Sequence, residues 1–139
     1  MKRIMGIDFG TKRTGIAVTD ELQIIASGLT TIETSHIFPF LEHYFQKENV
    51  ETVVVGLPKR LNNENSTVEE QIQQFITRFK NSFPSIQLQR QDERFTSKIA
   101  AKTMIDSGLK KKKRQKKELI DEISATIILQ SYMERKRFI

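Results

Sequence analysis

The first thirty-three residues alternate between apolar and polar positions in a way that predicts three antiparallel β-strands. In the first strand Ile4, Gly6 and Asp8 share one face, while the other face is wholly apolar. Glycines at 10 and 15 bound a turn-like stretch, as expected between paired strands. The predicted strands cover residues 4–9, 16–20 and 24–33.

The middle of the chain changes to helical spacing and to one continuous apolar run. The run "ETVVVGLP" at 51–58 predicts a parallel strand that is covered on both faces. A helix over 36–48, capped by Ser35, precedes it, and apolar residues at helical spacing predict another over 67–81. The remaining predictions are a strand within "SIQLQRQDE" at 85–93, a short helix ending at Gly108, and a last helix over 118–135.

Three antiparallel strands followed by alternating helices and strands indicate a mixed α/β sheet flanked by helices. The 139 residues suit a single domain, 1–139, that buries its core without metal or disulfide cross-links. The chain has no cysteine, no apolar leader and no apolar run long enough for a membrane helix. We therefore expect a cytoplasmic protein with no membrane partner.

The net charge of +6 comes from one short segment. Residues 110–117, "KKKKRQKK", hold seven cations in eight positions, and the rest of the chain carries a net charge of −1. Close cations without acidic counterparts repel one another, and such blocks often meet a polyanion. We predict a basic, mobile loop that faces nucleic acid, although a solvated extension of the last helix is the simpler alternative.

Carboxylates stand at three places where a strand or helix pattern predicts apolar surroundings or a strand end. Asp8 interrupts a buried strand, where an unpaired charge is costly. Asp92 and Glu93 lie where the last strand ends, at the edge where open α/β sheets bind ligands. Asp121 lies at the margin of the apolar stripe of the last helix. Each has a simpler explanation: a turn cap for Asp8, a helix-dipole pair for Asp92 and Glu93, and a solvated helix start for Asp121.

Taken together, these carboxylates predict a metal site. Converging carboxylates repel unless a cation neutralises them, and oxygen ligands without Cys or His favour Mg²⁺ or Mn²⁺. Two such ions, about 4 Å apart, activate a water and stabilise the leaving oxygen of a phosphodiester. The residues therefore indicate metal-dependent phosphodiester hydrolysis.

Four segments, in order, resemble the motifs of the bacterial YqgF/RuvX family. They are "GIDFGTKRTGIAVTD" at 6–20, "VVVGLP" at 53–58, "DERFTS" at 92–97 and "IDEISATIILQSYM" at 120–133. The first also resembles the phosphate loop of the actin and sugar-kinase group, but this chain is too short for the two domains those proteins need. The YqgF/RuvX resemblance spans nearly the whole chain and implies a ribonuclease H-like fold with a five-stranded mixed sheet.

The resemblance also implies residue roles. Asp8, Glu93 and Asp121 match the catalytic, metal-binding carboxylates, which would hold two Mg²⁺ or Mn²⁺ ions, with Asp92 as a neighbouring group. Arg94 would be a phosphate or structural partner. Nucleic-acid contacts are expected from two further sets of cations: Lys12 and Arg13 in the first turn, and Lys110, Lys111, Lys112, Lys113, Arg114, Lys116 and Lys117 in the basic block.

The family resemblance implies a nuclease in 5′-end maturation of pre-16S ribosomal RNA. One alternative is a Holliday junction resolvase that acts on four-way DNA junctions, which would be expected to work as a dimer. Another is a nucleic-acid-binding module without catalytic activity. The sequence leaves the choice between RNA and DNA, and the oligomeric state, open.

Overall fold

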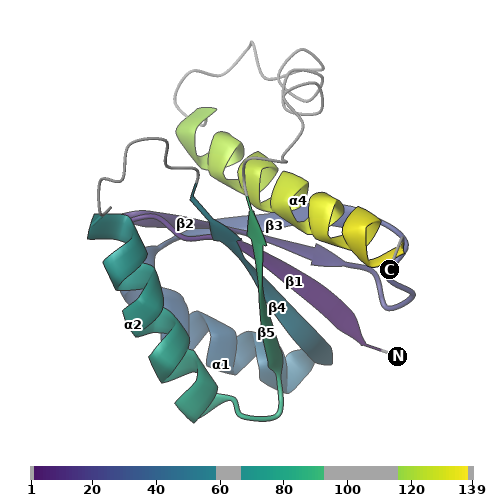
Figure 1. Ribbon diagram of the computed structural model, residues 1–139, viewed down its shortest axis with the longest axis horizontal. Coiled ribbons are helices and arrows are strands. Elements are labelled where there is room, and N and C mark those ends of the chain that lie inside the picture. Colours follow the sequence, from purple (N-terminus) through teal and green to yellow (C-terminus); the bar gives the residue numbers. More distant parts are fainter. Residues whose placement is uncertain (1, 59–66, 93–115, 138–139) are drawn as a thin grey trace.

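The described residues build one mixed sheet with the strand order β3-β2-β1-β4-β5 (Figure 1). The computed structural model describes residues 2–58, 67–92 and 116–137. β1 pairs antiparallel with β2 and parallel with β4, β2 pairs antiparallel with β3, and β4 pairs parallel with β5. The predicted mixed sheet is therefore confirmed. The strands are β1 Arg3–Asp8, β2 Arg13–Thr19, β3 Ala26–Glu33, β4 Val50–Leu57 and β5 Gln87–Asp92.

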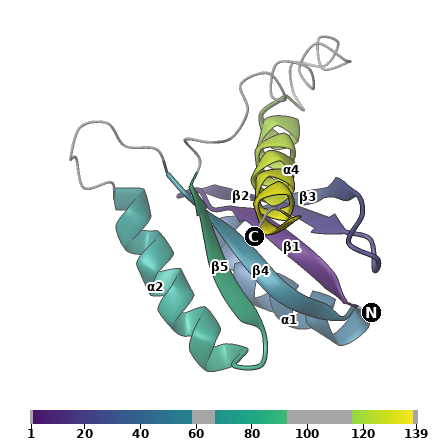
Figure 2. The same cartoon turned by 45° about the vertical axis from the view of Figure 1, so that its right-hand side comes forward.

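Helices cover both faces of this sheet (Figure 2). Helices α1 (Ile37–Lys47) and α2 (Thr67–Ser82) lie on one face, and α4 (Lys116–Arg137) lies on the other. β4 shows why both layers are needed. Val53 and Val55 belong to the core beneath α1 and α2, whereas Val54 packs with residues of α4, and all three are fully buried. The continuous apolar run thus forms a strand covered on both faces, as predicted.

The expected helix cap at Ser35 is wrong. A 3₁₀ turn, Thr34–His36, leads into α1, and the N-cap residue is His36, whose side chain makes no capping hydrogen bond. Thr34 instead contacts the turn after β1: its backbone N–H donates to Lys12 O (2.9 Å) and its hydroxyl donates to Gly10 O (2.7 Å). A tertiary contact therefore fixes the start of this helical segment.

The ends of several predicted elements shift by one to three residues, and two of these shifts fall in predicted binding segments. β2 begins at Arg13, so half of the stretch expected to form a turn is strand. α4 begins at Lys116, so the last two residues of the predicted mobile block are helical; lysine and glutamate favour helix, which lets α4 start two residues early. Residues 110–115 and the short helix predicted before Gly108 lie outside the described residues.

No helix in the described part of the chain is long and apolar enough to cross a membrane.

Candidate active site at the carboxyl edge of the sheet

Asp8 is the last residue of β1 and lies half-buried at the carboxyl edge of the sheet. β1, β4 and β5 are parallel, so their carboxyl ends meet at this edge, as the sequence predicted. Asp8 shares the face of Ile4 and Gly6, and both of those residues lie against α4. The Asp8 carboxylate therefore projects to the α4 side of the sheet.

Asp121 reaches the same place from α4, and a glycine allows the approach. Asp8 pairs with Gly15 of β2, and paired residues of antiparallel strands point to the same face. A Cβ built on Gly15 would collide with the backbone carbonyl of Asp121. The helix backbone thus lies directly on the strand beside Asp8. The two carboxylates, 113 positions apart in the sequence, are brought to one corner of the molecule.

Arg13 neutralises Asp121 in this structure. Its Nε donates to Asp121 Oδ2 at 2.9 Å, and the Asp121 side chain is only 21% exposed. The sequence predicted a nucleic-acid contact for Arg13 and did not predict this ion pair. The pair joins two segments far apart in the chain, so no local pattern could have indicated it.

The turn that carries Lys12 and Arg13 is tightly constrained. A side chain at Gly10 would collide with the Arg13 carbonyl, so the turn requires glycine there. The Thr14 and Thr34 hydroxyls share a hydrogen bond of 2.8 Å beneath it. Lys12 is exposed at the tip, and its side chain forms no ion pair with any residue in the described ranges. Such a cation is available to a phosphate near the acidic pair.

Asp92 ends β5 at the same edge but points to the opposite face. It pairs with Leu57, and the alternation along β5 puts it on the side of Leu88, which packs beneath α1 and α2. It also makes an interaction of its own. Asp92 therefore does not join Asp8 and Asp121 on the α4 side.

Gln91 is a candidate site residue that the sequence analysis missed. Ile7, Val55 and Arg90 form one row across three strands, so the next row contains Asp8, Gly56 and Gln91. Gln91 is 4% exposed, and its Oε1 has no hydrogen-bond partner within the described structure. A buried unsatisfied oxygen is costly and calls for an explanation. The sequence signal that could have identified Gln91 is the alternation of glutamines in "QLQRQ", which puts Gln87, Gln89 and Gln91 on one face of the strand.

Arg90 stabilises the carboxyl edge of the sheet from the face that α1 and α2 cover. It donates to both carboxylate oxygens of Glu69 in the first turn of α2, at 3.2 and 3.1 Å, and to the carbonyls of Val55 and Gly56 at the end of β4. These hydrogen bonds from Arg90 hold the pKa of Glu69 below its ordinary value of 4.5, against the opposing effect of burial. The hydrogen bonds of Arg90 hold the end of β4, the strand that lies between Asp8 and Gln91.

The remaining predicted site residues fall outside the described part of the chain. Glu93, Arg94 and residues 110–114 lie beyond the described ranges, and the side chains of Lys116 and Lys117 are not described. Within residues 2–58, 67–92 and 116–137, no three His, Cys, Asp or Glu side chains form a group able to hold a metal ion. The described site therefore contains two of the three predicted carboxylates.

The fold is that of RuvC. A solved structure of Thermus thermophilus RuvC in complex with Holliday junction substrate matches with a TM-score of 0.60 and 12% identity, over 97% of this chain and 96% of the RuvC chain. Another T. thermophilus RuvC structure gives a TM-score of 0.57 and 14% identity, over 96% of each chain. The expected ribonuclease H-like fold is thereby confirmed.

The sequence comparisons define the family. Residues 2–135 match the family described as "RuvX: Holliday junction resolvase", and the chain belongs to this family. It is 61% identical to a protein of Flavobacterium psychrophilum over 98% of this chain and 99% of that protein. It is 60% identical to a protein of Flavobacterium johnsoniae, over 99% of this chain and all of that protein. Both relatives are named "Putative pre-16S rRNA nuclease". Membership places the chain among hydrolases that act on phosphodiester bonds of nucleic acids.

Proposed function

We propose that this chain is a divalent-metal-dependent nuclease that acts in 5′-end maturation of pre-16S ribosomal RNA. The observation that carries the proposal is the meeting of Asp8 and Asp121 beside Gly15 at the carboxyl edge of the sheet. The substrate is inferred from the names of relatives that are 61% and 60% identical over nearly the whole chain.

The donor set at this edge fits Mg²⁺ or Mn²⁺. Asp8 and Asp121 offer hard carboxylate oxygens, and Gln91 offers a neutral amide oxygen without a partner in the described structure. Glu93 is proposed as the third carboxylate. It directly follows Asp92 in the sequence and matches the glutamate of the family's D-E-R motif. When bound, a pair of such ions supplies an activated water and charge stabilisation for the leaving oxygen.

The chain's own residues have two tasks in this proposal. Asp8, Glu93 and Asp121 orient the ions, while Arg13 keeps the Asp121 charge compensated until a metal or a phosphate is present. Lys12, Arg13, Arg94 and the basic block 110–117 bind the phosphate backbone, which makes affinity dependent on salt. These cations position the nucleic acid and do not read its sequence.

The test compares substrates and metals in one assay. The purified chain is incubated with a 5′ fragment of pre-16S RNA or with a synthetic four-way DNA junction, each with Mg²⁺, Mn²⁺ or EDTA at matched ionic strength. We expect metal-dependent cleavage of the RNA that disappears in Asp8→Asn and persists in Glu70→Gln, an exposed acid on α2.

The alternatives give different results. Symmetric paired nicks in the junction without cleavage of the RNA would favour the resolvase described for the family, which would also require a dimer. Binding of both substrates with cleavage of neither would favour a binding module.

A further inference from the structure

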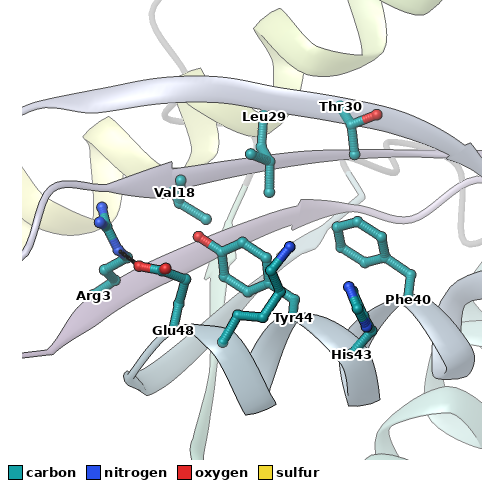
Figure 3. A pocket seen from close by; sticks show the side chains of 9 residues that line it. Arg3, Val18, Leu29, Thr30, Phe40, His43, Tyr44 and Glu48 are labelled. Carbon is teal, nitrogen blue, oxygen red and sulfur yellow. Dashed lines mark hydrogen bonds and ion pairs between the residues drawn. The ribbon is translucent and has the colours of Figure 1, made fainter.

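A groove lies on the face of the sheet opposite the acidic pair, between α1 and the strands β2 and β3 (Figure 3). Its volume of about 530 Å³ lies within the range of small-ligand sites. None of the proposed catalytic residues lines it.

A β-bulge shapes one wall of this groove. Ile16 pairs with Thr30 and Ala17 with Gly28, so Leu29 is the extra residue in β3. Bulges re-aim side chains, and Leu29 lines the groove beside Val18 of β2. Figure 3 shows both aliphatic side chains directed toward α1. Leu29 remains 37% exposed, so this apolar wall faces open space.

Two aromatic rings form the opposite wall. Phe40 and Tyr44 lie one turn apart on α1, with ring centroids 6.0 Å apart and ring planes 15° from parallel. The Tyr44 hydroxyl makes no hydrogen bond to any other described residue, and burial raises the pKa of this phenol, which keeps it neutral at physiological pH. The groove is therefore a slot with an aliphatic side and an aromatic side, which suits a flat, ring-shaped group.

Polar groups stand at one end of the slot and along its open side. At the end, Arg3 Nε donates to Glu48 Oε1 at 2.8 Å, while Glu48 Oε2 has no hydrogen-bond partner in the described structure. His43 and Lys47 are exposed along the open side, and neither forms an ion pair with another described residue. The site thus combines a free acceptor oxygen, a neutral hydroxyl and a cation that is available to an anion.

We propose that this groove binds one nucleotide of single-stranded RNA, with its base in the slot and its phosphate beside Lys47. Bases stack on aromatic side chains, and their phosphates need cations. The Glu48 oxygen that has no partner among the described residues accepts a hydrogen bond from an exocyclic amino group, so the groove prefers bases that carry one, such as cytosine and adenine, to uracil. This inference rests on the proposed nuclease function, since it takes RNA as the substrate.

The groove is connected to the acidic edge through α1. Thr34 holds the Gly10–Lys12 turn, and α1 begins three residues later. The same turn leads into Arg13, which contacts Asp121. An RNA strand that leaves the acidic edge past this turn would follow α1 to the slot. The bound nucleotide would therefore lie outside the cleaved position and contribute to substrate affinity.

The test uses nucleotides as probes of the full chain. CMP, AMP, UMP and inorganic phosphate are titrated while the methyl NMR signals of Val18 and Leu29 are followed. We expect CMP and AMP to shift the Val18 signal with an affinity at least about threefold higher than that of UMP, and phosphate alone to leave it unchanged. Unshifted signals with every nucleotide, or equal affinity for phosphate alone, would overturn the proposal.

Two variants locate the binding. Leu29→Trp fills the slot and should weaken CMP binding at least about tenfold, since the base can no longer stack there. Lys47→Gln should weaken it about threefold and reduce its salt dependence. Leu22→Trp and Lys80→Gln, which change exposed residues outside the groove, are the matched controls. Both variants should first be shown to unfold at the same temperature as the parent chain. If Lys47→Gln and Leu29→Trp then bind CMP as tightly as the parent, the groove assignment is contradicted.

Cleavage assays separate this inference from the proposed function. With the groove assignment correct, Leu29→Trp raises KM for an RNA that extends beyond the cleaved site and leaves kcat unchanged. CMP binding without any RNA cleavage would overturn the nuclease proposal and leave the groove standing. Metal-dependent RNA cleavage without CMP binding would overturn only the groove.

Discussion

Arg13 and Asp121 lie 108 positions apart in the sequence and form an ion pair of 2.9 Å at the carboxyl edge of the sheet. The pair connects the start of β2 with the first turns of α4. The Arg13 guanidinium compensates the charge of Asp121 when no metal is bound. The proposed metal site therefore has a stable state without an ion.

Arg13→Gln should lower stability in EDTA and recover it in Mg²⁺. Loss of the partner leaves the Asp121 charge beside the other carboxylate, and a partly exposed pair contributes about 0.5–1 kcal/mol. Thermal unfolding with and without Mg²⁺ measures the change. Lys12→Gln, the exposed neighbour, is the control and should show neither effect. Equal losses in both variants would contradict the compensating role of Arg13.

Asp8→Asn should abolish RNA cleavage while the fold is retained. The amide removes one charge from a repelling cluster and weakens metal binding, so thermal stability without metal should stay equal or rise. Cleavage and unfolding temperature are measured on the same preparation. Activity equal to that of the parent chain, with contaminating nuclease excluded, would remove Asp8 from the catalytic set.

Gly15→Ala should destabilise the protein because the added methyl group meets the Asp121 backbone, which cannot rotate away. Overpacking of this kind typically costs about 1–3 kcal/mol. Gly28→Ala is the matched control on β3, where the new Cβ would lie 3.2 Å from the Glu122 side chain, which can move. Urea unfolding should show the larger loss for Gly15→Ala, and the reverse order would argue against the close approach of α4.

Glu69→Gln should remove an acid-sensitive part of the stability. Arg90 lowers the pKa of Glu69 in the folded chain below 4.5, so the stabilisation is complete above that pH and is lost as the pH falls through the folded value. The variant should therefore be less stable than the parent at pH 7, and the difference should shrink at about pH 3. Denaturant unfolding across this range checks the sign, with Glu70→Gln as the exposed control.

The basic block should contribute to affinity rather than to the chemical step. Its four leading lysines would be replaced by glutamine: Lys110, Lys111, Lys112 and Lys113. RNA binding should weaken, and the slope of log affinity against log salt should decrease by about 0.7 for each phosphate that the block no longer neutralises. Cleavage of saturating RNA should persist. Unchanged affinity at low salt would indicate a solvated segment.

Local residue patterns predict most of the secondary structure and indicate Asp8 and Asp121 as candidate site residues. Period-two alternation marked β1, the uninterrupted apolar run of β4 indicated cover on both faces, and helical spacing marked α2. These signals are local, because side-chain direction repeats every two residues in a strand and every 3.6 in a helix. Asp8 and Asp121 were identifiable because a charge at an apolar position is costly and needs a partner.

Which of these groups lie together depends on tertiary packing. Gly15 lies within a strand, and its absent side chain is explained only by α4 crossing directly over it. The Arg13–Asp121 pair, the bulge at Leu29 and the Gln91 oxygen, which has no partner within the described ranges, likewise depend on registers between segments far apart in the chain. Such registers are set by packing over the whole sheet, so the local pattern of residues contains no record of them.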